Sequence, residues 1–159
     1  MMPPVLLWDA ALATQRLPEY QVEVTATHVI LGALATRDYA RMHHDVSYAK
    51  QQSGTRDIFL NTPTQALWFQ RYVTDWSGPH GRLGRMRFRM KVPVCPGDRL
   101  RMAGEVQHAE LDAQGCGWVR LTLSMHVADR VTTECEARLA LPCTADDNPW
   151  QRRGSAWQP

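Results

Sequence analysis

Four side chains of the kinds that transfer protons lie within eight residues of one another: Asp38, His43, His44 and Asp45. Asp38 and His43 are five residues apart, and in a turn or a partly extended loop this spacing lets both side chains converge on one small site. A carboxylate and an imidazole around one water molecule form a general acid and base pair, and histidine is easily set to titrate near neutral pH. The stretch therefore contains a candidate catalytic pair, Asp38 and His43.

The same residues also have ordinary structural explanations. Asp38 can cap a turn, while His43 can be a partly buried polar residue with a backbone partner. His44 is expected to point elsewhere and to have a structural role. Asp45 is expected to cap a short helix over about 46–52. Spacing alone leaves the catalytic and the structural interpretation of Asp38 and His43 open.

A longer helix is predicted over 64–76, TQALWFQRYVTDW, because its apolar residues recur at spacings of three and four. Asn61 or Thr62 can cap this helix, and Pro63 fits its first turn. The Ser-Gly-Pro sequence at 77–79 ends it. The helix therefore has one apolar face that must be buried against another element.

The second half of the chain has the alternating pattern of β-strands. Residues 85–92 alternate between basic and apolar side chains. Further strands are predicted over 99–111, 117–128 and 130–141. Residues 26–38 are predicted to begin as a strand, with a helix from Ile30 onward as the alternative. Three long strands in meander order form an antiparallel sheet with the long helix covering one face, so the predicted fold class is α+β.

Length and composition limit the class of protein. The 159 residues suit one domain, predicted over 18–143, with an N-terminal extension over 1–17 and a flexible tail over 144–159. A net charge of +2 is too small to indicate a nucleic-acid-binding protein. No apolar run approaches the roughly 18 residues of a membrane span, so a soluble cytoplasmic protein is expected. The four cysteines lack C-x-x-C spacing, which favours reduced structural thiols in strands over a metal site or disulfides.

The sequence ATRDYARMHHDVSYA resembles the hydratase loop of the MaoC-like, R-specific enoyl-CoA hydratases of the hotdog fold. The family pattern is Asp, any residue, Asn, Pro, any residue, His, and here Asp38 and His43 occupy its two reactive positions. Ala40 and Arg41 replace the Asn-Pro pair. The wider stretch 34–79 is closer still to the small catalytic subunit of the heteromeric enoyl-CoA hydratases with which bacteria degrade steroid side chains. That branch also lacks the Asn-Pro pair.

The resemblance implies a single hotdog, in which an antiparallel sheet wraps a long central helix. It implies an enoyl-CoA hydratase subunit that adds water across an α,β-unsaturated acyl-CoA, in particular a steroid side-chain enoyl-CoA. Asp38 is assigned to water activation and His43 to proton delivery, and the Thr62 N–H at the helix start is expected to bind the oxyanion. Asn61 and Arg87 are predicted to bind substrate. Arg87 belongs to a basic row that can either meet the phosphates of coenzyme A or face solvent.

The resemblance also implies partners. One hotdog unit exposes a sheet edge that is prone to pair, and a second MaoC-like hotdog subunit is expected in a heterotetramer with two copies of each. Neither a metal nor another cofactor is expected, because coenzyme A is part of the substrate, and neither nucleic acid nor membrane is an expected partner. Two alternatives stay open. One is a general short- or medium-chain enoyl-CoA hydratase or dehydratase, with a thioesterase less expected, and the other is a non-catalytic acyl-CoA-binding hotdog subunit.

Overall fold

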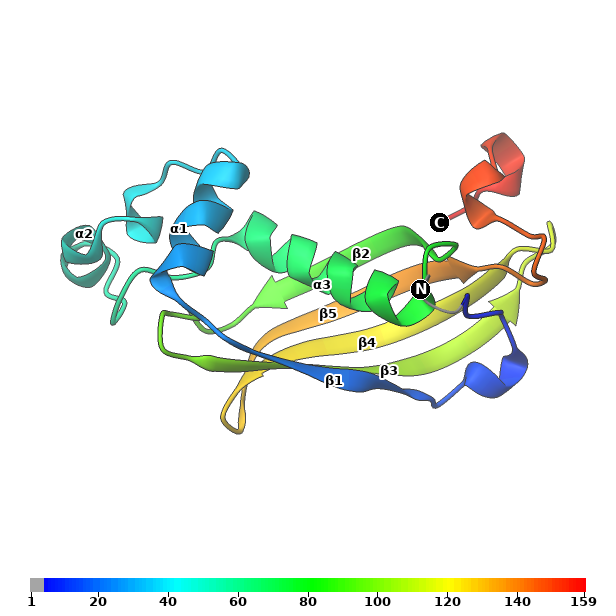
Figure 1. The fold of residues 1–159 in the computed structure, drawn as a ribbon, viewed down its shortest axis with the longest axis horizontal. Helices are drawn as coiled ribbons and strands as arrows, with labels where there is room; N and C mark the ends of the chain where they lie inside the picture. The colour runs from blue at the N-terminus through cyan, green and yellow to red at the C-terminus, as the bar shows by residue number, and fades with distance from the viewer. Residues whose placement is uncertain (1–4) are drawn as a thin grey trace.

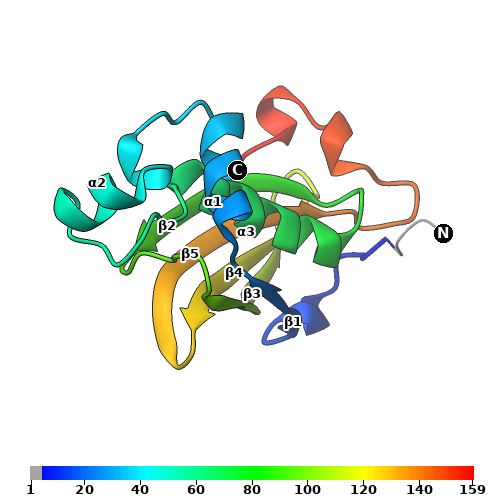
Figure 2. The same cartoon turned by 60° about the vertical axis from the view of Figure 1, so that its left-hand side comes forward.

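A computed structural model describes residues 5–159, in which one long helix lies across a five-stranded sheet (Figure 1, Figure 2). The main elements are β1 (Arg16–Glu23), α1 (Ala26–Ala35), α2 (Val46–Gln51), α3 (Thr62–Ser77), β2 (Arg82–Met90), β3 (Arg99–Leu111), β4 (Gly117–Val127) and β5 (Arg130–Leu141). Short 3-10 helices span Ala10–Leu12, Arg41–His43, Pro149–Gln151 and Gly154–Ala156. The arrangement confirms the predicted α+β class.

The strands run in the order β1-β3-β4-β5-β2, and every neighbouring pair is antiparallel. The three long strands of the predicted meander are all present, within one residue of their expected ends. The sequence interpretation did not include β1, which pairs with β3 and forms one edge of the sheet. The other edge is β2, whose Arg85, Arg87 and Arg89 are exposed while Met86 and Phe88 pack against the core.

The central helix α3 follows directly from its local sequence. The Asn61 side chain accepts a hydrogen bond from the Thr64 N–H, and Pro63 occupies the first turn, as predicted. Gly78, with φ of 76°, ends the helix in a left-handed conformation that favours glycine. The residues of α3 that face the sheet are buried, namely Gln65, Phe69, Tyr72 and Val73. Leu67 was expected on the apolar face but is 53% exposed.

The prediction of a strand at the start of 26–38 is wrong. These residues form α1, and the helix begins at Ala26 rather than at Ile30. The Thr25 hydroxyl accepts from the His28 N–H, and the His28 ring accepts from the Thr25 N–H. This reciprocal cap, together with burial of one apolar face, outweighs the weak strand preference of β-branched residues.

A close contact places α1 against the first turn of α3. A Cβ added at Gly32 would lie 2.4 Å from the Thr64 hydroxyl oxygen. Only glycine therefore lets the two helices approach to this distance without a shift of one of them. The contact matters for function because the candidate catalytic loop leaves the last turn of α1, while the expected oxyanion donor lies in the first turn of α3.

Both ends of the described chain pack against the sheet. The strand β1 begins two residues before the predicted domain boundary at residue 18. Ahead of it, Leu12 is buried and the Thr14 N–H donates to the Val106 carbonyl. Residues 1–4 of the predicted extension lie outside the described residues. Residues 144–159, the segment predicted to be a flexible tail, contact β2, β4 and β5.

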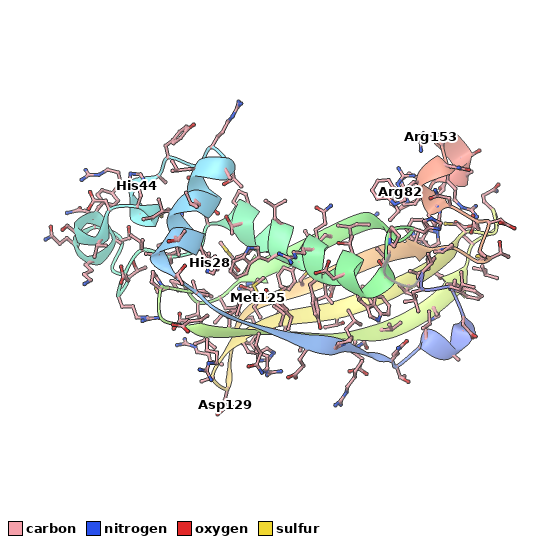
Figure 3. All side chains as sticks on the ribbon, in the orientation of Figure 1. His28, His44, Arg82, Met125, Asp129 and Arg153 are labelled. Carbon is pink, nitrogen blue, oxygen red and sulfur yellow. The ribbon has the colours of Figure 1, made fainter. Side chains whose placement is uncertain are left out.

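The contacts of the C-terminal segment centre on Trp157. Its ring lies 4.9 Å from the buried Trp118 ring, and the guanidinium of Arg82 lies 3.6 Å from its centroid. Arg85 and Arg138 donate to carbonyl groups of the last two residues. Figure 3 places Arg82 beneath this segment, at the opposite end of the long axis from His44. Arg85, one of the basic residues of the alternating stretch 85–92, is therefore bound by the C-terminal segment.

Replacing Trp157 with Ala is expected to lower the melting temperature by about 4–8 °C. The change removes an aromatic pair and a cation–π contact, which together contribute about 2 kcal/mol. The measurement is a thermal unfolding curve by circular dichroism. Trp157→Phe is the control, because it keeps an aromatic ring over Trp118, and a loss as large as that of Trp157→Ala would contradict the stacking explanation.

The remaining composition predictions have mixed outcomes. The four cysteines are free, as expected, but only Cys135 lies in a strand. Burial raises the pKa of Cys135 to about 12, which keeps the thiol protonated at neutral pH. Within residues 5–159, every helix is too short or too polar to cross a bilayer.

Candidate active site

The loop that follows α1 positions Asp38. Arg37 adopts a φ of 55°, a left-handed conformation that non-glycine residues rarely take, and it turns the chain sharply. The Asp38 N–H then donates to the Ala33 carbonyl at 2.9 Å. The Asp38 Oδ1 accepts a hydrogen bond from the Ala40 N–H at 3.2 Å, which closes a turn. The 3-10 helix that contains His43 begins directly after this turn. The side chain of Asp38 remains 29% exposed.

The structure brings the predicted pair together. His43 is buried, and its Nε2 lies 3.4 Å from the Asp38 Oδ2. Its Nδ1 lies 2.8 Å from the Phe59 carbonyl oxygen. Because a carbonyl oxygen only accepts hydrogen bonds, Nδ1 must carry the hydrogen and donate it. In the neutral ring, Nε2 therefore presents a lone pair toward Asp38. Two hydrogen-bond acceptors, the His43 Nε2 and the Asp38 Oδ2, thus lie next to each other.

Asn61 completes the immediate surroundings of Asp38. Its Nδ2 donates to the Asp38 Oδ2 and to the Thr36 hydroxyl oxygen, both at 2.9 Å. The hydrogen bond from Asn61 lowers the pKa of Asp38 against the opposing effect of burial, and the Ala40 N–H and His43 lower it further. Asp38 is therefore ionised at neutral pH.

The predicted oxyanion donor lies one residue further along the chain. Thr62 is the first residue of α3 and is exposed. Among residues 5–159, its N–H has no hydrogen-bond acceptor. Pro63 has no N–H, and the Thr64 N–H is already bonded to Asn61. The Thr62 N–H is thus the available donor at this helix start, next to the residue that holds Asp38.

The other sequence-predicted residues lie outside this group. Arg87 is exposed on β2, opposite Glu136 on β5, and among residues 5–159 no hydrogen bond or ion pair joins it to Asp38 or His43. Its predicted role in substrate binding stays a prediction. Asp45 caps α2 through the Tyr48 N–H, which confirms the role expected of it. His44 is exposed, and its expected structural role stays a prediction.

Three groups that hold the site residues or α3 in place were not predicted from the sequence. The Phe59 carbonyl fixes the His43 ring, the Thr36 hydroxyl accepts from Asn61, and Gln65 ties α3 to the sheet. The buried Gln65 amide accepts from the Thr133 hydroxyl at 2.6 Å and donates to the Leu60 carbonyl at 3.3 Å. A polar residue on the buried face of an otherwise apolar helix pattern was the available signal for Gln65. A backbone carbonyl has no sequence signal.

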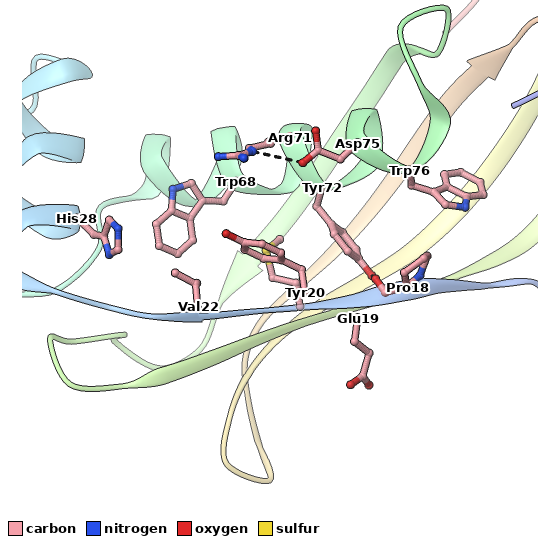
Figure 4. A pocket seen from close by; sticks show the side chains of 11 residues that line it. Pro18, Glu19, Tyr20, Val22, His28, Trp68, Arg71, Tyr72, Asp75 and Trp76 are labelled. Atoms are coloured by element: carbon pink, nitrogen blue, oxygen red, sulfur yellow. Dashed lines mark hydrogen bonds and ion pairs between the residues drawn. The ribbon is translucent and has the colours of Figure 1, made fainter. Parts of the chain in front are cut away.

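A separate groove lies between α3 and β1 (Figure 4). It has a volume of about 330 Å³, and the rings of Tyr20, Trp68, Tyr72 and Trp76 line it. The ion pair of Arg71 and Asp75 lies on its rim. Neither Asp38 nor His43 lines this groove, so this apolar groove is distinct from the candidate catalytic pair.

The chain is similar to known proteins in sequence and in fold. No family model matches the chain. The 3-oxo-4,17-pregnadiene-20-carboxyl-CoA hydratase beta subunit of Mycobacterium tuberculosis is 41% identical over 90 residues, which cover 57% of this chain and 69% of that protein. A chain of the ChsH1-ChsH2 complex from the same organism superposes with a TM-score of 0.74 at 31% identity, covering 81% of this chain and 97% of its own.

A more distant structure shares the fold. The (R)-hydratase from A. caviae involved in PHA biosynthesis superposes with a TM-score of 0.72 at 19% identity, and the match covers 82% of this chain and 96% of that chain. The five-stranded antiparallel sheet around one long helix is thus the predicted hotdog fold. Fold, helix start and sequence relationship lead to the same assignment. The chain belongs to the MaoC-like enoyl-CoA hydratases.

Proposed function

We propose that this chain is the catalytic subunit of a heteromeric enoyl-CoA hydratase, with Asp38 and His43 as its catalytic pair. The observation that carries the proposal is the meeting of two acceptors, the His43 Nε2 and the Asp38 Oδ2, at 3.4 Å. A water molecule can donate one hydrogen to each of them. Such a water has its oxygen lone pairs free to attack the β-carbon of an unsaturated thioester.

The fixed tautomer of His43 supports roles for Asp38 and His43 that differ from those the sequence predicted. His43 Nε2 must gain a proton before it can deliver one, because Nδ1 carries the hydrogen of the neutral ring. Asp38, stabilised as a carboxylate, is a weak base. We therefore assign the water proton to His43 Nε2, which passes it to the α-carbon as the hydroxyl bonds to the β-carbon. Asp38 orients the water and stabilises the imidazolium charge.

Besides an activated water and a proton for the α-carbon, the reaction needs stabilisation of an oxyanion, and the start of α3 can supply it. As the hydroxyl adds, negative charge develops on the thioester oxygen. Thr62 is exposed, its N–H is unused among the described residues, and the N–H lies at the positive end of the helix dipole. We assign oxyanion stabilisation to this N–H. No cofactor enters these steps, because coenzyme A is part of the substrate.

Substrate and partner are proposed from the named relatives. One relative is named for a pregnadiene-carboxyl-CoA, and one matching chain belongs to a two-protein complex. We propose a steroid side-chain enoyl-CoA as the substrate, and a second hotdog subunit in a heterotetramer as the assembly. The sheet is open, with β1 and β2 as its edge strands, which supports pairing with another subunit.

The test compares the chain alone with the chain co-expressed with a candidate hotdog subunit from its own genome. Hydration of 3-oxo-4,17-pregnadiene-20-carboxyl-CoA and of crotonyl-CoA is followed by loss of the enoyl thioester absorbance. We expect the steroid substrate to be hydrated only when both subunits are present. Hydration of crotonyl-CoA by the chain alone would instead indicate a general enoyl-CoA hydratase.

An acyl-CoA-binding subunit is the second candidate, and the groove between α3 and β1 favours it. Aromatic side chains line this space without the candidate catalytic pair, as expected of a site that holds an apolar group without reacting with it. This candidate predicts that Asp38→Asn leaves the activity of a complex intact. The catalytic proposal predicts a large loss for the same variant.

A further inference from the structure

We propose that Asn61 is a positioning residue, which fixes the Asp38 carboxylate beside His43 Nε2 and stabilises its negative charge, rather than a residue that binds substrate. The inference rests on the proposed function, because it assigns a role within the same site. It replaces the substrate-binding role that the sequence predicted for Asn61.

The contacts of Asn61 leave one orientation for its amide. The Oδ1 accepts from the Thr64 N–H at 3.1 Å, so the Nδ2 must be the atom that faces Asp38 and Thr36. The Thr36 hydroxyl donates to carbonyls in the last turn of α1, and its lone pairs are therefore directed to Asn61. Both ends of the amide are occupied within the chain.

Burial separates Asn61 from any substrate. Its residue surface is 1% exposed, whereas the Asp38 side chain is 29% exposed. The substrate can therefore approach the carboxylate from the open side while Asn61 lies behind it. One amide thus connects the start of α3, the end of α1 and the catalytic loop, and it determines where the Asp38 Oδ2 lies relative to His43.

The charges around Asp38 leave Asn61 as its main stabilising neighbour. Besides Asp38, the ionisable groups within residues 36–45 and 55–61 are Arg37, Tyr39, Arg41, His43, His44, Asp45, Arg56 and Asp57. Arg41 pairs with Asp45, and Arg56 pairs with Asp98. The last two turns of α1 and the first turn of α3 contain no ionisable side chain. Of these groups, His43 is the one that lowers the Asp38 pKa through its charge when its ring is protonated, and its effect is smaller than that of the Asn61 hydrogen bond.

The decisive variant is Asn61→Ser. Serine is a strong helix N-cap, so α3 keeps its start, but the amide donor to Asp38 is lost. Loss of a hydrogen bond to a charged group is expected to raise the pKa of Asp38 by about one pH unit. Because the reaction needs both an ionised Asp38 and an unprotonated His43, the acid limb of the kcat/KM profile reports both groups, and a raised Asp38 pKa is expected to move this limb to higher pH.

Two measurements read this change. The pKa of Asp38 is followed by carbon-detected NMR of the side-chain carboxyl in the free protein, and the pH dependence of kcat/KM is followed with the full complex. Asp45→Ser is the matched control, since it replaces the cap of the neighbouring helix α2 and leaves the Asn61 contacts in place. Its Asp38 pKa is expected to stay within about 0.2 pH units of wild type.

The outcomes separate this inference from the proposed function. An unchanged Asp38 pKa in Asn61→Ser overturns the positioning role, and a raised KM with an unchanged pH profile returns Asn61 to substrate binding. The NMR titration needs no substrate. If wild type hydrates no enoyl-CoA but the Asp38 pKa still rises in Asn61→Ser, the proposed function fails and the positioning role stands.

Discussion

Replacing His43 with Ala is expected to lower the rate of enoyl-CoA hydration by on the order of 100-fold or more, with the fold retained. In the neutral ring, the Nε2 lone pair at 3.4 Å from Asp38 is the group that receives the water proton. Without it, the water loses one of its two acceptors and the α-carbon loses its proton source. The measurement is kcat/KM of the purified complex, with circular dichroism to establish folding.

Asp38→Asn is expected to cause a loss of similar size. The two residues hold one water together, so the double variant should be little worse than either single variant. His44→Ala is the matched control, because His44 is the adjacent histidine but is exposed and outside the group. Activity of His43→Ala close to that of His44→Ala would remove the pair from the mechanism.

Replacing Phe69 with Ala is expected to destabilise the chain by about 3–5 kcal/mol and to lower its melting temperature by roughly 6–20 °C. Phe69 is fully buried at the middle of α3, where it joins the helix to the sheet and lies 6.1 Å from the Phe88 ring of β2. Truncation removes this apolar surface and leaves a cavity that the curved sheet only partly closes.

Leu67→Ala supplies the comparison for this loss. Leu67 lies two residues away on the same helix but is 53% exposed, so its truncation in the isolated chain should change stability by about 0.5 kcal/mol or less. Urea unfolding of the two variants measures the difference. Equal losses would mean that α3 is held by its helix propensity and not by its buried face.

Local patterns in the sequence determined most of the secondary structure. The spacing of apolar residues and the Asn-Thr-Pro start predicted α3, and strict alternation over 85–92 predicted β2. The strand patterns that follow predicted β3 to β5. Such elements are predictable because their periodicity and caps involve residues a few positions apart. The stretch 26–38 was misread at its start for a related reason, since β-branched residues there have a weak preference that a cap and a packed face reverse.

The sequence also located the candidate pair, but a resemblance contributed as much as the spacing did. Asp38 and His43 five residues apart are compatible with many loops, and their side chains meet only because Arg37 turns the chain and the 3-10 helix returns it. The cap formed by their neighbour Asp45 was predictable, because capping depends on residues a few positions apart.

Only the tertiary structure determined the tautomer of His43 and the stabilisation of the Asp38 carboxylate. The Phe59 carbonyl that fixes the His43 tautomer comes from 16 residues away, and the Asn61 amide that stabilises Asp38 comes from 23 residues away. A carbonyl is present at every position, and an asparagine before a helix predicts a cap whether or not it reaches a carboxylate. These contacts arise when α1 approaches α3 at Gly32, a distance set by packing between elements that local periodicity does not encode.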